Sequence, residues 1–342
     1  MPKLYGDDQK AIINLLGDVS KYATDRQKVI DDLIKLSQEG PYDMKPSAVS
    51  ALKKAYDLSQ FESIDISNRI KDIIRIAVVQ FGFELTNSFP PRLVDRESTK
   101  RKVFSALKMA KQHNANIVCL PELCMSQEWL KEIKDGYPNM IVIAGSYYNK
   151  LNQNVSEVLI DSCNDIPHQI KVNPSVPENS NFMETRMNSG EQINIYKTKY
   201  GIFSVLICRD FGNFAPLLRG KIDMILVPSY NRANDRFHKE ADNHVTNSPS
   251  YVIISNTAIF GGTSIFGQLN NTYLKELKTK GYKKEIDNSY KLCEMEENEE
   301  GLIIADFNLI HKSPPLQAPI DAIEELRLLS VTNINKVKLP KE

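Results

Sequence analysis

The chain has 342 residues, enough for one large α/β body of roughly 250 residues with an appended segment. Lys and Arg total 43, and so do Asp and Glu, so no net charge favours nucleic acid or an anionic membrane as a partner. Five cysteines lie at irregular spacing without CxxC or paired histidines, which argues against disulfides and zinc. No apolar run approaches the roughly 20 residues of a membrane helix, and the N-terminus lacks a signal-peptide core. We therefore expect a soluble, cytoplasmic protein.

The first part of the chain carries helical periodicity without a strand signal. Apolar residues recur at helical spacing over 12–19, 24–34 and 46–56, with a weaker pattern over 61–70. We predict an all-helical N-terminal extension over residues 1–70. Two interpretations stay open, an accessory layer that packs on the neighbouring domain and a module that binds a protein partner.

Near residue 71 the pattern changes to short apolar runs that alternate with helical stretches. Because nearly every run is apolar throughout, we expect an α/β body over residues 71–312 with a sheet core buried on both faces. Helices are predicted at 98–112, 213–220 and 232–247. Strands are predicted at 74–81, 117–120, 140–146, 158–161, 168–172, 193–197, 201–207, 224–227, 251–256 and 302–306.

Two later segments differ from this body. Residues 269–300 are rich in charge and poor in apolar side chains, which predicts a solvated insertion. Residues 313–342 are predicted to leave the sheet, first as a helix over 320–329 and then as a tail.

Three predicted strand ends each carry one reactive side chain, namely Glu122, Lys171 and Cys208. In open α/β sheets ligands bind beyond the carboxyl ends of the strands, so these three side chains can share one pocket. Cys208 is expected at a strand-to-helix turn, where free backbone N–H groups favour a thiolate and can receive an oxyanion. A nearby lysine would stabilise both negative charges.

Each of these residues also has a purely structural interpretation. Cys208 alone is more often a small core side chain than a nucleophile. Glu122 can be a carboxylate in the first turn of a helix, and Lys171 can extend from a strand end into solvent. Only the combination of the three favours a catalytic site.

The combination resembles the carbon–nitrogen hydrolase, or nitrilase, superfamily, whose members use Glu, Lys and Cys in this chain order. The similarity covers about residues 72–310 and rests on IRIAVVQF, ANIVCLPEL, KVNPSVPE and YGIFSVLICRDFGNF. Further along the chain, SYVIISNTAIFGGTSIFG is similar to the family's Asn-containing strand and glycine-rich segment. The resemblance implies a four-layer α-β-β-α sandwich, commonly assembled into homodimers or larger homo-oligomers.

The resemblance also implies a role for each reactive residue. Cys208 is the nucleophile, and Glu122 is the general base that first takes the thiol proton and later activates water. Lys171 and the backbone N–H of Arg209 stabilise the oxyanion that forms on the substrate.

Other positions are less closely matched to the family pattern. Glu178 corresponds best to the family's second carboxylate, although Glu184 lies close enough in sequence to take that place. Arg209 departs from the aromatic residue often found after the cysteine, which leaves the shape of the pocket open. Arg209, Asn231 and Arg232 are the predicted substrate contacts, for a polar or anionic group.

We expect a hydrolase that cleaves a non-peptide carbon–nitrogen bond of amide or carbamoyl type through a cysteine thioester, with release of ammonia or an amine. An amide is favoured over a nitrile because most of the family resembles amidases. The mechanism requires no metal or organic cofactor, and the expected partners are a small amide and further copies of the chain. The alternative is a non-catalytic module that binds or assembles through its N-terminal helices. An activated Cys208 should react with iodoacetamide well below the usual thiol pKa of about 8.5, whereas a core thiol should not.

Overall fold

A computed structural model describes residues 32–33, 35–36, 48, 63–65, 71–160, 166–175, 178, 187–248, 250–267, 290–309 and 331–340. The chain divides into two compact units, Met1–Phe61 and Glu62–Glu342, which are considered separately. In the first unit the few described residues are helical, and the rest of the predicted N-terminal helices lies outside the described residues.

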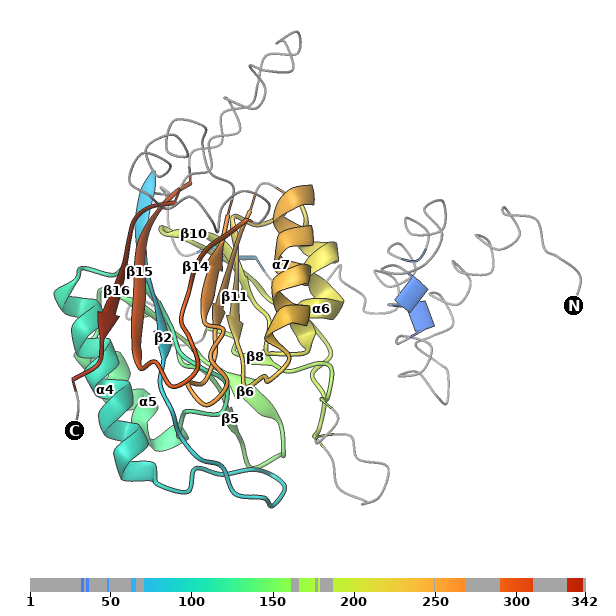
Figure 1. Ribbon diagram of the computed structural model, residues 1–342. Helices are drawn as coiled ribbons and strands as arrows, with labels where there is room; N and C mark the ends of the chain where they lie inside the picture. Colours follow the sequence, from blue (N-terminus) through green and yellow to red (C-terminus); the bar gives the residue numbers. More distant parts are fainter. Residues whose placement is uncertain are drawn as a thin grey trace, which may run out of the picture. The chain divides into compact units, whose positions relative to one another are not determined.

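The second unit is built on a seven-stranded sheet in the order β1-β9-β10-β11-β12-β13-β14 (Figure 1). Its middle strands β10, β11 and β12 are parallel, whereas β9, β13 and β14 join through antiparallel pairs. The strands are β1 Ser63–Asp65, β9 Ile195–Thr198, β10 Gly201–Val205, β11 Met224–Pro228, β12 Tyr251–Ser255, β13 Ser264–Phe266 and β14 Lys291–Glu294.

A second sheet has six strands in the order β16-β15-β2-β3-β4-β7, with β2, β3 and β4 parallel. A third, small sheet pairs β5, β6 and β8. The six strands are β2 Ile73–Gln80, β3 Ile117–Cys119, β4 Ile141–Ile143, β7 Val158–Leu159, β15 Gly301–Asn308 and β16 Val331–Lys338. The small sheet consists of β5 Tyr147–Tyr148, β6 Asn154–Ser156 and β8 Gln169–Ile170.

The alternating directions of the side chains along β2 show how the layers of the fold form. Ile76 and Val78 enter an apolar cluster that also contains Phe203 of β10, so this cluster lies between the two large sheets. Ala77 and Val79 enter a second cluster together with Val103 and Leu107 of a helix. Successive residues of a strand point to opposite faces, so β2 is buried on both sides. The expected α/β class with two-sided burial of the sheet is confirmed.

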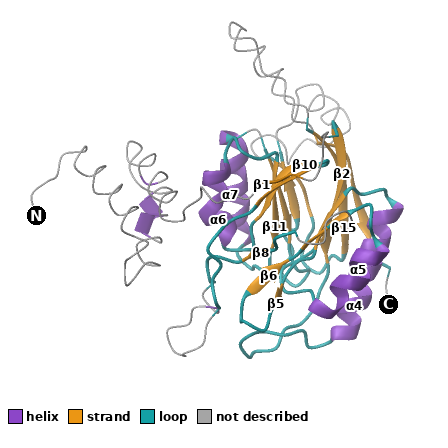
Figure 2. Cartoon of the chain, turned by 180° about the vertical axis from the view of Figure 1, so that it is seen from behind, coloured by secondary structure: helices purple, strands orange, loops and turns teal. Residues whose placement is uncertain are grey.

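Helices lie against the outer faces of both large sheets (Figure 2). The longest, α4, begins after Asp95, whose carboxylate accepts the N–H of Ser98 at 2.9 Å as an N-cap. No helix in the described ranges has the length and apolar character needed to cross a membrane. The helices are α4 Arg96–Gln112, η3 Gln127–Trp129, α5 Leu130–Gly136, α6 Asp210–Phe214, η5 Ala215–Leu218 and α7 Asn234–Asn247.

Two strands lie in segments that we expected outside the sheets. β14 falls within the predicted insertion at 269–300, yet its Cys293 pairs with Ile265 of β13 and packs against the cluster between the sheets. β16 falls within the predicted tail, yet it pairs with β15 along nearly its whole length. Both are edge strands. The residues of β14 are only half-buried, and half of the residues of β16 are exposed, so neither strand has the continuous apolar run of a strand buried on both faces.

Two smaller expectations also need correction. Ser63–Asp65, expected within a weak helical segment, forms β1 and pairs in parallel with β9. The helix expected at 213–220 starts earlier, at Asp210, directly after the turn that carries Cys208. The strand β1 gave no signal in the sequence because a three-residue strand is stabilised by its neighbour in the sheet and has no periodicity of its own. The predicted helix at 320–329 and residues 268–289 lie outside the described residues.

Candidate active site

Glu122 lies three residues beyond the end of β3. Three buried apolar residues form the strand, and Pro121 ends it because proline cannot donate a hydrogen bond to the sheet. The N–H of Glu122 bonds the carbonyl of Ser229 at 3.2 Å, which ties this loop to the end of β11 in the other large sheet. Glu122 is therefore held where the ends of strands from both sheets meet.

Cys208 follows β10 at a sharp turn that leads into α6. Its φ of +48° lies in the left-handed region, which non-glycine residues adopt at a cost of about 1 kcal/mol or more. Its N–H bonds the carbonyl of Pro228 at 2.8 Å, so the turn is fixed to the neighbouring strand β11. Such local strain persists only where surrounding contacts hold it, and it is concentrated at functional sites.

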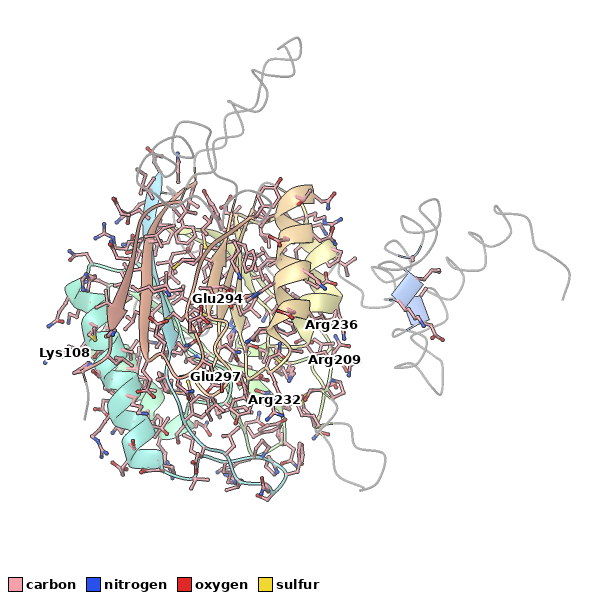
Figure 3. The ribbon with its side chains drawn as sticks, viewed as in Figure 1. Lys108, Arg209, Arg232, Arg236, Glu294 and Glu297 are labelled. Atoms are coloured by element: carbon pink, nitrogen blue, oxygen red, sulfur yellow. The ribbon has the colours of Figure 1, made fainter. Side chains whose placement is uncertain are left out.

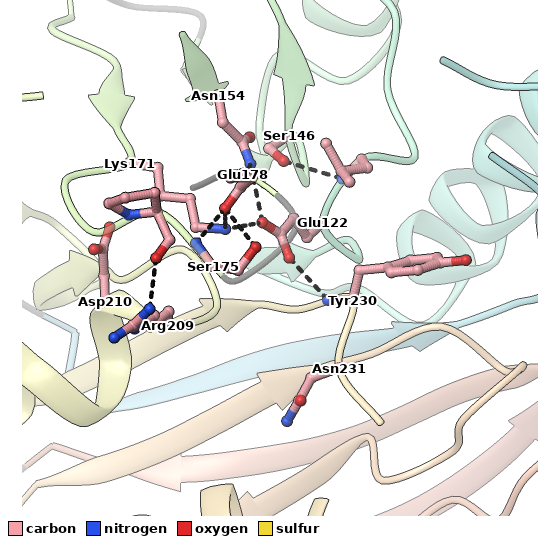
Figure 4. A network of polar contacts seen from close by, with 12 residues as sticks. Glu122, Ser146, Asn154, Lys171, Ser175, Glu178, Arg209, Asp210, Tyr230 and Asn231 are labelled. Atoms are coloured by element: carbon pink, nitrogen blue, oxygen red, sulfur yellow. Dashed lines mark hydrogen bonds and ion pairs between the residues drawn. The ribbon is translucent and has the colours of Figure 1, made fainter. Parts of the chain in front are cut away.

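Lys171 follows β8 and is almost completely buried, with 1% of its surface exposed. Its Nζ donates to Oε1 of Glu122 at 2.8 Å and to Oε2 of Glu178 at 2.7 Å. A buried ammonium without partners would be very costly, so the two carboxylates account for its presence. The structure thus brings together Glu122, Lys171 and Glu178 (Figure 4).

The thiol of Cys208 joins the same group. It lies close enough to Glu122, Lys171 and Glu178 for their charges to shift its pKa. The backbone N–H of Tyr230 lies at 3.0 Å from Oε2 of Glu122 and also interacts with Cys208. All four residues that we predicted as catalytic therefore lie in one connected cluster. Glu184, the other candidate for the second carboxylate, lies outside the described residues.

Glu178 is held by more donors than Glu122. Ser175 donates both its N–H and its hydroxyl to Oε2, each at 2.7 Å, and Tyr148 donates its hydroxyl to Oε1. Asn154 bridges the two carboxylates, because its Nδ2 lies 2.9 Å from Oε1 of Glu122 and 3.2 Å from Oε1 of Glu178.

Sequence reasoning missed Ser175, Tyr148 and Asn154. Tyr148 and Asn154 belong to β5 and β6, short strands of the small sheet that we did not predict. Ser175 lies in the quoted segment KVNPSVPE, but nothing in the sequence says that it binds Glu178. Their role depends on which strands pair in three dimensions, so no local pattern could have identified them.

The two glutamates differ in proton affinity. Burial raises the pKa of Glu178, but the charge and hydrogen bonds of Lys171, with those of Tyr148 and Ser175, lower it to about 2. For Glu122, burial outweighs the opposing charge of Lys171 and raises the pKa above its ordinary value. Glu178 therefore stays ionised, and Glu122 is the carboxyl group that binds a proton more readily than an ordinary glutamate.

The thiol and the lysine also have shifted pKa values. Burial and the charge of Glu122 raise the pKa of Cys208, although Lys171 opposes them. Burial would lower the pKa of Lys171, but Glu122 and Glu178 raise it well above the ordinary value. Burial first, and the carboxylates that oppose the charge of Lys171 second, thus favour the neutral thiol of Cys208 over the thiolate expected at this turn. A neutral thiol needs a base before it can attack a substrate.

The predicted substrate contacts lie at the edge of the cluster. Nη1 of Arg209 donates to the carbonyl of Pro174 at 2.8 Å. Asn231 exchanges hydrogen bonds with Asn256, and its own Nδ2 has no protein partner among the described residues. Arg232 is exposed and lies over the ring of Phe260, and Figure 3 shows it with Arg209 on the side where α6 and α7 lie. Their contact with a substrate stays a prediction.

The described part of the chain has no group of three or more His, Cys, Asp or Glu side chains arranged to hold a metal ion. The cluster is instead suited to acyl transfer. It offers a thiol, a buried carboxyl group close to it that can act as a base, and a buried cation that can stabilise an oxyanion.

By sequence, no protein-family model matches the chain, and no curated protein matches it. By structure, it is similar to Saccharomyces cerevisiae Nit3, a member of branch 10 of the nitrilase superfamily. That similarity has 18% identity and a TM-score of 0.50, over 71% of this chain and 92% of Nit3. A cysteine-to-serine variant of the Nesterenkonia AN1 amidase, from the nitrilase superfamily, matches with 15% identity and a TM-score of 0.50, over 68% and 90% of the chains.

A third similar structure is the glutamine-dependent NAD+ synthetase from Acinetobacter baumannii, with 15% identity and a TM-score of 0.47. This similarity covers 72% of our chain but 49% of the synthetase, so the chain spans about half the length of that protein. Identities of this size bear on the fold alone. The resemblance inferred from the sequence is thus confirmed as a fold, and the second unit has the fold of the nitrilase superfamily.

Proposed function

We propose that this chain is a carbon–nitrogen hydrolase that cleaves a small amide through a thioester on Cys208. The observation that carries the proposal is the placement of Cys208 close to a buried carboxyl group, Glu122, which is itself bound to Lys171. Placing these charges away from water costs free energy, and such clusters are most often maintained where a reaction uses them.

The first half-reaction forms the thioester. Sγ of Cys208 attacks the amide carbon while its proton passes to Glu122, and the carbonyl oxygen becomes an oxyanion. Nζ of Lys171 and the backbone N–H of Arg209 are the proposed donors to this oxyanion. When the carbon–nitrogen bond breaks, Glu122 returns the proton to the nitrogen, which leaves as ammonia or an amine.

The second half-reaction hydrolyses the thioester. Glu122, now a carboxylate again, takes a proton from a water molecule whose oxygen attacks the acyl carbon. The carbon–sulfur bond then breaks, and Glu122 gives the proton to Sγ of Cys208. The raised pKa of Glu122 suits both steps, because a stronger base removes the thiol and water protons more readily.

Glu178 has a supporting role in this proposal. Its carboxylate fixes Lys171 and, with Asn154, the orientation of Glu122. A permanently charged partner keeps Lys171 protonated throughout the cycle. Asn231 and Arg232 are the proposed contacts for a polar or anionic part of the substrate.

The proposal includes the finer architecture expected from the family, a four-layer α-β-β-α sandwich. Three observations support it. An apolar cluster joins residues of both large sheets, α4 packs on the opposite face of the six-stranded sheet, and α7 contacts β12 and β13 of the other.

Release of ammonia or amine from a panel of small amides, ureido acids and glutamine tests the proposal. Replacement Cys208→Ala should lower turnover by about a thousandfold or more, because the attacking atom is lost. Cys293→Ala is the matched control, since this half-buried thiol of β14 lies outside the cluster and should leave turnover unchanged. Full turnover by Cys208→Ala, or a wild type that hydrolyses no member of the panel, would contradict the proposal.

A further inference from the structure

Arg209, the residue after the candidate nucleophile, directs its side chain onto the loop that follows Lys171. Its Nη1 donates to the carbonyl of Pro174 at 2.8 Å, a contact drawn in Figure 4. The side chain is partly buried. A guanidinium donor makes a stronger hydrogen bond to a carbonyl than a neutral donor does, so this contact is well suited to fix a loop.

The next residue holds the same loop from a second direction. The buried carboxyl group of Asp210 accepts the N–H of Val172 at 3.0 Å and the N–H of Asn173 at 2.7 Å. The two residues after Cys208 therefore hold three consecutive residues of the loop, Val172, Asn173 and Pro174.

This loop carries two groups of the buried cluster. Lys171 stands at its start, and Ser175 stands at its end. Ser175 donates its N–H and its hydroxyl to Oε2 of Glu178, the oxygen that also accepts Nζ of Lys171. A shift of Pro174 would therefore move Ser175, and with it the carboxylate that fixes the lysine.

We propose that Arg209 is a positioning residue. It holds the Pro174–Ser175 segment so that Lys171 and Glu178 keep their positions relative to Cys208. This proposal builds on the proposed hydrolase function and differs from the substrate contact predicted for Arg209 from the sequence. In the positioning role the side chain acts on every substrate alike, whereas a substrate contact would select for anionic ones.

Two measurements on Arg209→Met, a replacement of similar length without charge, test the proposal. First, kcat should fall about ten- to a hundredfold for neutral and anionic amides alike, because the reacting groups are misplaced. Second, the pH midpoint for alkylation of Cys208 by iodoacetamide, followed by peptide mass mapping, should move upward. Lys171 lowers the pKa of both Glu122 and Cys208, so its displacement raises both.

A double-mutant cycle shows whether Arg209 acts through the loop. In a Ser175→Ala background the upward shift caused by Arg209→Met should be smaller, because one of the two hydrogen bonds from this residue to Glu178, that of the hydroxyl, is already lost. An equal shift in both backgrounds would mean that the Arg209 charge acts directly on the thiol, and it would overturn the proposal. Arg209→Lys, which keeps one donor, should recover part of the loss, and this variant also serves if Arg209→Met fails to fold.

The matched control is Arg101→Met, which removes an exposed arginine of α4 and should change neither readout. A rise in KM for anionic amides alone, with kcat and the alkylation midpoint unchanged, would overturn the positioning role. The alkylation readout needs no turnover. If the wild type hydrolyses no amide while the midpoint still shifts, the proposed function fails and the positioning role stands.

Discussion

The two buried glutamates illustrate how one cluster can hold a permanent anion beside a proton acceptor. Glu178 accepts hydrogen bonds from Ser175, Tyr148, Asn154 and Lys171. Burial raises its pKa, but the charge of Lys171 and the hydrogen bonds of Lys171, Tyr148 and Ser175 lower it to about 2. Burial dominates at Glu122 and raises its pKa. Pairs of titratable groups with opposite shifts of this kind mark acid–base assignments in enzymes.

A first prediction concerns the pH dependence of kcat/KM. Glu122 acts as the base only when ionised, and its pKa is raised, so the rate should rise with pH through an apparent pKa above the ordinary 4.5. No further rise is expected near pH 9, because the pKa of Cys208 is raised above its ordinary 9.0 and the thiol stays neutral. The pH–rate profile of the wild type measures both points.

Variants of the two glutamates assign the acid limb of this profile. Glu122→Gln should abolish turnover, whereas Glu178→Gln should keep a lower activity. In Glu178→Gln the acid limb of the profile should move to lower pH, because the charge of Glu178, which raises the pKa of Glu122, is lost. A rate that climbs through pH 8–9, as for an ordinary thiolate nucleophile, would contradict the assignment of Glu122 as base.

At the residue scale, sequence reasoning could find the reactive side chains but not their environment. Glu122, Lys171 and Cys208 each follow an apolar run, so their placement at strand ends was predictable. The state of the Cys208 thiol was not, because it depends on two carboxylates that approach from distant segments. Asn154, whose amide bridges those carboxylates, carries no local signal at all.

At the scale of elements, close contact between loops fixes the position of Glu122. Gly145, two residues beyond β4, has a φ of +56°. A Cβ at this position would lie 2.0 Å from the carbonyl oxygen of Pro121 and 2.8 Å from Sγ of Cys124. Only glycine lets the end of β4 approach the Pro121–Glu122 loop this closely.

A second prediction follows for Gly145→Ala. The added methyl group must displace the Pro121–Glu122 loop, so turnover should fall by about tenfold or more. The positive φ and the displaced backbone should also lower the free energy of unfolding by about 1–3 kcal/mol. Chemical denaturation and amide hydrolysis measure the two effects.

Gly136→Ala is the matched control for this substitution. Gly136 ends α5, and a Cβ there would meet no atom within 4 Å. Its replacement should leave turnover unchanged and stability unchanged or slightly higher, because alanine is less flexible than glycine in the unfolded chain. Equal behaviour of the two variants would contradict the proposed contact.

Which elements were predictable depends on how much of their stability is local. The strand β11 is apolar throughout, and β2 and β10 are largely apolar, because both of their faces are buried over most of their length, so their sequences identify them. Edge strands such as β14 and β16 take their stability from one neighbour far away in the sequence. Such pairings cannot be read from a run of side chains.

At the scale of the whole molecule, the site exists because two sheets pack face to face. Glu122 follows β3 of the six-stranded sheet, whereas Cys208 follows β10 of the seven-stranded sheet. The apolar cluster between the sheets, which includes Phe203 and Ile76, brings these two strand ends together. The α/β class was predictable from the uniform strands, but the topology that places these ends side by side required the structure.

The central claim is that Cys208 forms a thioester with the acyl part of an amide. The most direct measurement is acid quenching during turnover of a panel substrate, followed by intact-mass analysis and peptide mapping. We predict an adduct with the mass of the acyl group on the peptide that contains Cys208, which hydroxylamine removes as expected for a thioester. Turnover without any such adduct, or an adduct on another residue, would contradict the account. Undiminished turnover after Cys208→Ala would contradict it as well.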